Sequence, residues 1–109
     1  MEKEITKGDY GYYIYFYLYD ENGQAFDVSG GVFRFKAQRY GEKTLKVEGT
    51  CSVVDPSGVV AYQVAKGDFD STGLYRAEVE GSFPTAIRTW NRDLEQKPFT
   101  LKVISDLPQ

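Results

Sequence analysis

The stretch from Tyr10 to Tyr19, YGYYIYFYLY, decides the fold class of this chain, because seven of its ten residues are aromatic. Successive side chains of a strand point to opposite faces, so the stretch predicts a strand with two unlike faces. The face suited to line a core consists of Tyr12, Ile14, Phe16 and Leu18. The other face consists of Tyr13, Tyr15, Tyr17 and Tyr19. Each of these rings carries a hydroxyl that needs water or a partner, so this face of the sheet is suited to being covered.

The composition argues against several classes of function. The 13 basic and 16 acidic residues give a net charge of −3, whereas a nucleic-acid partner requires a basic surplus. The chain has no histidine and one cysteine, which removes the commonest general base and the usual ligands of zinc, haem and iron–sulfur clusters. We therefore expect a protein that is not an enzyme and that has no cofactor and no metal. Cys51 lies in the segment TCSVV, where we expect a buried, unreactive thiol.

The N-terminus and the hydrophobic pattern give no sign of export or membrane insertion. The first residues, MEKEITKGD, are charged and lack the apolar run of a secretory signal. No apolar stretch approaches the ~20 residues that a membrane-spanning helix needs. We expect a soluble protein that is made in the cytoplasm and has no membrane partner.

Turn signals recur at short, regular intervals along the chain. They are Gly8-Asp9, Asn22-Gly23, Gly30-Gly31, Gly41, Asp55-Pro56-Ser57-Gly58, Gly67-Asp68, Gly73 and Gly81-Ser82. This spacing is typical of an all-β sandwich or barrel. We predict strands at Glu4–Lys7, Tyr10–Tyr19, Ala25–Val28, Val32–Arg39, Lys43–Val54, Val59–Ala65, Leu74–Glu80 and Pro98–Ile104. The fifth of these is expected to be broken or bulged at Gly49.

The longest connection between predicted strands runs from Gly81 to Lys97. A connection of this length either projects from the body as a functional loop or extends its flanking strands as a long hairpin, and both alternatives stay open. Helical periodicity is weak throughout the chain. Its best candidate, Asn91–Gln96, would form at most a turn or two.

A D-x-x-G-x-Y pattern, formed by Asp70, Gly73 and Tyr75, precedes one of the predicted strands. In immunoglobulin-like sandwiches a tyrosine at this corner sends its hydroxyl back to the upstream backbone. We expect Gly73 to permit the tight entry into the strand and Asp70 to accept backbone hydrogen bonds in the turn. Ala77 stands where antibody domains carry a cysteine, so the fold must form without that disulfide.

The layout of most of the chain resembles the N-terminal immunoglobulin-like domain of phage baseplate upper proteins. The matching segments are Lys7-Gly8-Asp9, the turn at 20–30, the strand start at 32–35, the hairpin at 53–62, Gly73 with Tyr75, and the last strand at 99–103. The resemblance implies a single immunoglobulin-like β-sandwich over residues 1–109, with about seven to nine antiparallel strands. It also implies a structural protein of a phage or phage-derived tail or baseplate, located in the virion. Its partners would be other baseplate proteins or further copies of itself in a homo-oligomer.

Two surfaces are candidates for such contacts. The first is the row of four tyrosines, which suits a protein interface. Its alternatives are a sugar-stacking platform of a carbohydrate-binding or adhesion module, and packing on its own sheet neighbours or under the 81–97 connection. The second surface lies in that connection and consists of Phe83, Ile87, Arg88, Trp90 and Arg92. Arg and Trp are common interface anchors, although Trp90 capping an open end of the sandwich is equally plausible.

The acidic residues near the turns do not make a metal or catalytic site. A calcium loop is suggested by Asp20, Asn22 and Asp27, but the further acids and the distal glutamate of an EF-hand are missing. Two acid pairs, Asp68 with Asp70 and Glu78 with Glu80, are expected in turns or on an outward strand face rather than as the paired carboxyls of a glycosidase. We expect all of them to be solvated charges.

Overall fold

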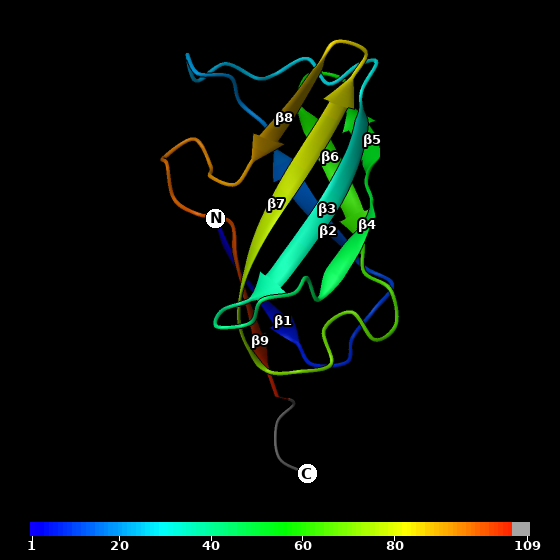
Figure 1. Ribbon diagram of the computed structural model, residues 1–109, viewed down its shortest axis with the longest axis vertical. Helices are drawn as coiled ribbons and strands as arrows, with labels where there is room; N and C mark the ends of the chain where they lie inside the picture. Colours follow the sequence, from blue (N-terminus) through cyan, green and yellow to red (C-terminus); the bar gives the residue numbers. More distant parts are fainter. Residues whose placement is uncertain (106–109) are drawn as a thin grey trace.

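Nine strands in two facing sheets make up the part of the protein that the computed structural model describes, residues 1–105 (Figure 1). The strands are β1 (Glu2–Thr6), β2 (Tyr13–Tyr17), β3 (Val32–Arg39), β4 (Val47–Thr50), β5 (Ser52–Asp55), β6 (Val59–Gln63), β7 (Gly73–Phe83), β8 (Ala86–Trp90) and β9 (Thr100–Ile104). The larger sheet has the order β1-β9-β7-β3-β4, with β8 also paired to β7. The smaller sheet has the order β2-β6-β5.

The order of the strands is that of an immunoglobulin-like sandwich. Such a fold places its strands B, E and D in one sheet and its strands C, F and G in the other. Here β2, β6 and β5 take the positions of B, E and D, and β3, β7 and β9 take those of C, F and G. β1 runs parallel to β9, and the other pairs are antiparallel. The predicted all-β sandwich is confirmed, and its cysteine is free.

Alternation along the strands fills the space between the two sheets with side chains. The Phe16 ring of β2 lies 5.6 Å from Phe35 of β3 and 5.2 Å from Phe99. Phe35 stacks on Tyr62 of β6 with 4.5 Å between the ring centroids. These contacts join both sheets in one core. The core also buries the predicted inward residues Ile14, Leu18, Phe33, Ala37, Val60, Val64, Tyr75, Ala77, Val79, Leu101 and Val103.

The tyrosine-rich strand is shorter than predicted, and one predicted strand is missing. The tyrosine-rich strand is five residues long. It begins late because Gly11, at a φ of +93°, donates its N–H to the carbonyl of Val64 and bends the chain ahead of Tyr13. The strand predicted at Ala25–Val28 is wrong, since Ala25 makes only an isolated bridge with Tyr19.

The break predicted within Lys43–Val54 occurs, but its position at Gly49 is wrong, and at the break the segment crosses from one sheet to the other. β4 pairs with β3 in the larger sheet, and β5 pairs with β6 in the smaller sheet. The crossing is at Cys51 and not at Gly49. The N–H of Cys51 donates to the carbonyl of Phe33. Gly49 stays in the β4 ladder under a ring of the core, where a Cβ would lie 2.6 Å from Tyr62 Cε1.

The connection from Gly81 to Lys97 forms a hairpin rather than a projecting loop. β7 continues to Phe83 and returns as β8, which pairs with the second half of β7. The first residues of β7, Gly73 to Arg76, pair instead with β9. β8 and β9 therefore follow each other along the same side of β7 (Figure 1). Between them the chain makes a tight turn, so the helical turn predicted at Asn91–Gln96 is wrong.

Two turns of the molecule share one design, in which an aspartate accepts two backbone hydrogen bonds. Asp20 and Asp93 each accept, through Oδ1, the N–H groups two and four residues further on. The donors are Asn22 and Gln24 in the first turn and Glu95 and Lys97 in the second. The residue three positions after each aspartate has a positive φ, +78° at Gly23 and +66° at Gln96. Gln96 is the only non-glycine residue with a positive φ in the described part of the chain.

Replacing Gln96 by glycine is expected to raise the free energy of unfolding by about 0.5–1 kcal/mol. The left-handed backbone conformation strains a residue with a Cβ by about 1–2 kcal/mol, and the larger entropy loss of glycine offsets part of the relief. The matched change Gly23→Ala introduces the same strain in the other turn and is expected to lower the free energy of unfolding by about 1 kcal/mol. Urea unfolding followed by the fluorescence of Trp90 measures both changes. Equal urea midpoints for Gln96→Gly and the unchanged protein would show that the backbone of Gln96 is not strained.

The Cys51 thiol is expected to react only when the protein opens. Burial raises its pKa to about 12, so the sulfur is protonated at neutral and mildly alkaline pH, whereas the thiolate is the reactive form. A disulfide-exchange reagent should label Cys51 at once in urea and at least a hundredfold more slowly in buffer. Equal labelling rates in the two solutions would show that Cys51 is not in the core.

Candidate functional site

The outer surface of the smaller sheet carries three tyrosines in a row, one at every second residue of β2. The antiparallel register with β6 places Gln63 opposite Tyr13, Ala61 opposite Tyr15 and Val59 opposite Tyr17. We call these six residues the tyrosine face. β2 and β6 contribute no charged side chain to this face, and β5 adds Ser52 and Asp55 beside β6.

The three rings of the tyrosine face lie open to solvent. Tyr13, Tyr15 and Tyr17 are 45%, 49% and 58% exposed, while the alternate residues Ile14 and Phe16 are buried in the core. The rings of Tyr13 and Tyr15 are 6.3 Å apart and inclined by 38°, so they stand side by side without burying each other. The connection at 81–97 does not cover them.

Tyr19, the predicted fourth member of the row, has a different position. β2 ends at Tyr17, and Tyr19 is half-buried beyond its end. The carbonyl of Tyr19 accepts a 3.0 Å hydrogen bond from Trp90 Nε1. Tyr19 therefore ties the end of β2 to the larger sheet and does not extend the exposed row.

The backbone of the three exposed tyrosines faces the open edge of the smaller sheet. β2 pairs with β6 alone among the described strands. In an antiparallel ladder, residues that bond to the neighbouring strand alternate with residues whose N–H and C=O point the other way. Val64 N–H donates to the Tyr12 carbonyl at 2.9 Å, and Leu18 N–H donates to the Gly58 carbonyl at 2.8 Å. The even-numbered residues thus bond to β6, and the odd-numbered tyrosines direct their amides to the free edge.

A groove of about 220 Å³ follows this free edge. Tyr15, Tyr17 and the half-buried Tyr19 form one wall, and Met1 with the turn at 93–95 forms the other. The groove reaches inward to Phe16 and Phe99, which belong to the core. The edge of β2 is therefore open along much of its length, where the groove separates it from the turn at 93–95.

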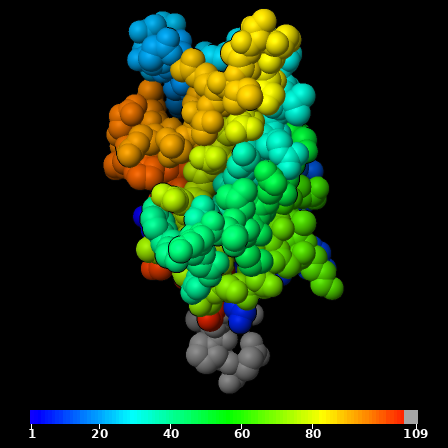
Figure 2. Space-filling view, in the orientation of Figure 1, coloured from blue at the N-terminus to red at the C-terminus, as the bar shows by residue number. Residues whose placement is uncertain are grey.

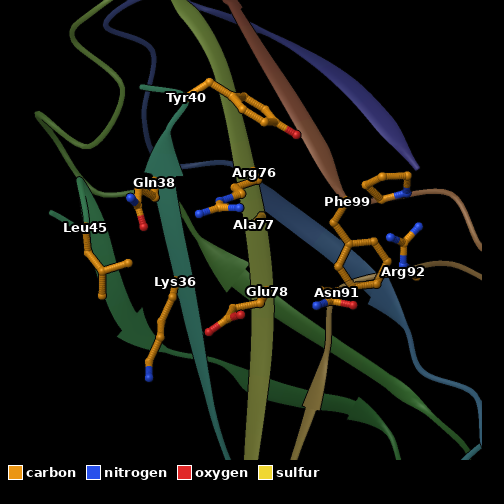
Figure 3. A pocket seen from close by; sticks show the side chains of 11 residues that line it. Lys36, Gln38, Tyr40, Leu45, Arg76, Ala77, Glu78, Asn91, Arg92 and Phe99 are labelled. Atoms are coloured by element: carbon orange, nitrogen blue, oxygen red, sulfur yellow. The ribbon is translucent and has the colours of Figure 1, made fainter. Parts of the chain in front are cut away.

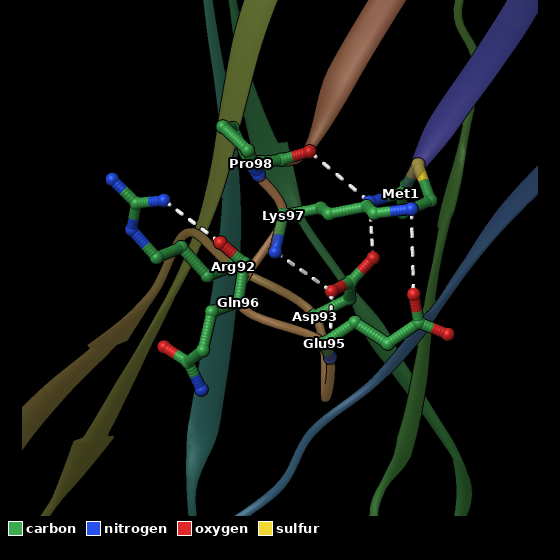
Figure 4. A network of polar contacts seen from close by, with 7 residues as sticks. All are labelled: Met1, Arg92, Asp93, Glu95, Gln96, Lys97 and Pro98. Atoms are coloured by element: carbon green, nitrogen blue, oxygen red, sulfur yellow. Dashed lines mark hydrogen bonds and ion pairs between the residues drawn. The ribbon is translucent and has the colours of Figure 1, made fainter.

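Asp93 holds the outer wall of this groove in place (Figure 4). Its Oδ2 accepts a hydrogen bond from the Met1 amino group, and its Oδ1 accepts the N–H of Lys97 at 2.9 Å. The Met1 amino group also donates to the Pro98 carbonyl at 3.1 Å. The amino group beside Asp93, together with the backbone donors, holds the pKa of that carboxyl below its usual value. The wall thus combines a charge pair with the turn geometry described above.

The second predicted surface is largely internal. Trp90 is 6% exposed and lies 5.0 Å from Phe26 and 6.1 Å from Phe33. Phe83 is half-buried against the same two rings, at 5.9 and 5.7 Å. The β7–β8 hairpin folds these side chains onto the end of the sandwich, which Trp90 caps. The interpretation of Trp90 as an exposed anchor is wrong, and the capping alternative is correct.

Arg88, Trp90 and Arg92 line one hollow of about 380 Å³ between the turns at 20–23 and 93–96, whereas Phe83 and Ile87 do not. Ile87 is 70% exposed on β8. Arg88 forms a 2.8 Å ion pair with Glu21, and this contact lowers the pKa of the Glu21 carboxyl. Arg92 donates a 2.9 Å hydrogen bond to the carbonyl of Gln96, within its own turn. Each arginine has its own polar partner, and the Arg88 guanidinium also lies over the Trp90 ring, 5.5 Å from its centroid, so three of the five predicted residues come together.

The outer face of the larger sheet is charged and carries two ion pairs. Lys36 lies 3.2 Å from Glu80, and Arg34 lies 3.6 Å from Glu48. A hollow of about 400 Å³ lies on this face between β3, β7 and the 91–98 turn (Figure 3). In the space-filling view this turn, in orange, protrudes at the side of the molecule (Figure 2). Basic, acidic and uncharged polar side chains line the hollow, among them Gln38, Arg76, Glu78, Asn91 and Arg92. This face is suited to water, in contrast to the tyrosine face.

The corner ahead of β7 contains the hydrogen bond expected of a tyrosine corner. The hydroxyl of Tyr75 donates to the carbonyl of Ser71 at 2.7 Å. Gly73 has a φ of +135°, which glycine adopts readily. The corner fixes the start of β7, the central strand of the larger sheet, and so has a structural role.

The carboxylate predicted to serve this corner is the wrong one. Asp70 pairs with Lys46 Nζ at 3.0 Å, and that contact lowers the pKa of the Asp70 carboxyl. Asp68 binds the backbone instead: its Oδ2 accepts the N–H of Ala65 at 2.8 Å and the hydroxyl of Tyr62 at 2.6 Å. The only sequence signal for this role was the Gly67-Asp68 turn, which does not reveal that the hydroxyl of Tyr62 also binds Asp68.

The other acidic turn residues also serve their own turns. Asp20 accepts the two backbone bonds already described, and Asp27 accepts the N–H of Ser29 at 2.9 Å and its hydroxyl at 2.6 Å. Within residues 1–105, no group of three or more His, Cys, Asp and Glu side chains is placed to hold a metal ion. In the same range, no helix has the length and apolar character needed to cross a bilayer.

Three buried or half-buried tyrosines are expected to resist ionisation in the folded protein. Burial raises the pKa of Tyr12, Tyr62 and Tyr75, and the hydrogen bond to Asp68 raises that of Tyr62 further. Because the folded state holds these protons more tightly than the unfolded state, their contribution to stability is present below the ordinary tyrosine pKa of about 10 and is lost as the pH rises above it. We expect about a third of the phenolate absorbance, from three of the nine tyrosines, to appear only as the protein unfolds in alkali. Complete ionisation of all nine in the folded protein would contradict the burial of these three.

No protein-family model and no curated protein matches the sequence.

Proposed function

We propose that this protein is a non-enzymatic structural module that acts through protein–protein contacts made by its tyrosine face. The observation that carries this proposal is a row of three uncharged, half-exposed tyrosines on a rigid sheet. Interface cores are depleted in charge and enriched in tyrosine. The assignment to a phage or phage-derived tail or baseplate is the second part of the proposal, and it rests on the resemblance of the sequence to the immunoglobulin-like domain of baseplate upper proteins.

The geometry of the row suits a protein partner. Side chains on one face of a strand repeat every ~6.6 Å, which matches the side-chain spacing of another pleated sheet or extended segment. Each ring offers a large contact area with only two side-chain torsions to immobilise, and its hydroxyl can bond at the rim of the contact. Tyr13, Tyr15 and Tyr17 therefore combine area, low entropy loss and hydrogen-bonding capacity in one line.

Carbohydrate binding is a second candidate. It is favoured by the groove of about 220 Å³ beside Tyr15 and Tyr17, whose outer wall includes Asp93 and Glu95, since sugars bind by ring stacking and hydrogen bonds to carboxylates. The inclination of 38° between the rings of Tyr13 and Tyr15 speaks against a shared flat platform. The protein interface is therefore the better-supported function.

The triple variant Tyr13→Ser/Tyr15→Ser/Tyr17→Ser is expected to fold and to lose association. The three rings lie outside the core, so their removal leaves the packing of β2 intact. Loss of interface tyrosines typically weakens binding by more than about 1 kcal/mol each, so the complex should weaken at least tenfold. Light scattering after size-exclusion chromatography, over a concentration series and with the products of neighbouring genes co-expressed, measures this. Ile87→Ser, at an exposed apolar site on the other sheet, is the matched control and should change nothing.

Two results would overturn the proposal. One is an unchanged protein that stays monomeric at every concentration and binds none of the neighbouring gene products. The other is equal association of the unchanged protein and the triple variant. A change of tyrosine fluorescence on adding polysaccharide, together with the first result, would establish the carbohydrate function instead.

A further inference from the structure

Five strands in the described part of the molecule have an edge without a neighbour: β1, β4 and β8 in the larger sheet, and β2 and β5 in the smaller sheet. An open edge can pair with another chain, and proteins protect such edges with charges, bulges or short strands. β1 carries three charged residues, and β8 has an arginine at its centre. β4 is four residues long and includes Glu48. The pairing of β5 is interrupted by a register shift between Val53 and Asp55.

β2 has none of these protective features. No charged residue occurs from Tyr10 to Tyr19, and the register between β2 and β6 is regular over all five residues. The amides of the three exposed tyrosines point to the free edge, and atoms of Tyr15 and Tyr17 line the open groove beside it. β2 is therefore the edge of this molecule at which a further strand can be added.

The sequence of β2 is complementary to itself in an antiparallel arrangement. YIYFY has tyrosine at the same positions when it is read in either direction. With Tyr15 on a two-fold axis, Tyr15 faces its own copy and Tyr13 faces Tyr17 of the second copy. These are the residues whose amides are free, so each facing pair of tyrosines is a hydrogen-bonded pair. Ile14 and Phe16 then face each other on the core side, and no like charges oppose one another on either side.

We propose that two copies of this chain associate by antiparallel pairing of their β2 edges about a two-fold axis at Tyr15. The inference rests on the proposed function and names the partner of the tyrosine face as a second copy. Pairing joins two three-stranded sheets into one sheet of six strands and doubles the row of tyrosines. Each copy has a net charge of −3, so two copies repel each other. This repulsion is smallest at the β2 edge, because the edge carries no charge.

Cysteines introduced into the full chain test the register of this pairing. Facing residues of a hydrogen-bonded antiparallel pair have Cα atoms about 5.5 Å apart, within the range of a disulfide. Under mild oxidation, Tyr15→Cys alone is expected to give a disulfide-linked dimer. Tyr13→Cys and Tyr17→Cys, which would lie ~13 Å from their own copies, should cross-link only when the two variants are mixed. The unchanged protein, with Cys51 in the core, is the control and should give none.

Charge substitutions separate edge pairing from stacking of the two faces. Tyr15→Lys places two like charges opposite each other across the axis and should weaken the dimer at least tenfold in a light-scattering concentration series. Ser52→Lys adds the same charge to the same sheet surface, two strands away from the edge, and should leave the dimer unchanged. If Ser52→Lys weakens association as much as Tyr15→Lys, the copies stack face to face and the inference is wrong.

Two further outcomes overturn the inference. Equal cross-linking of all three single variants, or none from any of them, excludes a two-fold axis at Tyr15. A chain that binds a neighbouring gene product through its tyrosines, but forms no Tyr15→Cys dimer, overturns the second copy as partner and leaves the proposed function standing. Failure of the proposed function looks different, since the chain then associates with nothing or associates equally well without its three exposed tyrosines.

Discussion

The packing of Phe16 between Phe35 and Phe99 is the interaction on which the rest of this structure depends. β2 is held by backbone hydrogen bonds on one side only, so its placement relies on the side chains that it inserts between the sheets. A slip of one residue in its register would turn the tyrosines into the core and expose Ile14 and Phe16. The direction of the tyrosine face is thus a consequence of how the core is filled.

The ends of the sandwich complete the surroundings of that face. At one end Trp90 closes the core and binds the carbonyl of Tyr19, which stops β2 from extending further. Along the side of the sandwich, β8 and β9 pair with different halves of β7, and the chain turns between them. Asp93 in this turn binds the Met1 amino group beside the β2 edge. The groove at that edge exists because two strands share one side of β7 and the chain must turn between them.

Much of the fold was predictable from the sequence because alternation of side chains is local. The pattern of Tyr10 to Tyr19 indicated which side chains line the core and which form the tyrosine row, and the structure shows that this row is exposed over β2. The crossing at Cys51 was not predictable, since the strands on either side of it read as one continuous run and only their partners in space separate them. Trp90 and Asp68 show the same limit, because their roles depend on Tyr19 and Tyr62, which they meet through tertiary contacts. The free edge of β2 likewise follows from sheet order and not from any feature of the strand itself.

The parallel pair formed by β1 and β9, which sets Glu2 beside Thr100, has a consequence for synthesis on the ribosome. This pair can form only after nearly all of the described chain has emerged, and folds that rely on such distant pairings form slowly. β2 emerges early, yet it must wait for β6 before either of its edges is covered. During that interval a nascent chain displays an uncharged aromatic strand to its neighbours on the same messenger. Productive folding and aggregation therefore compete for the same ten residues, and chaperone capture would be most useful there.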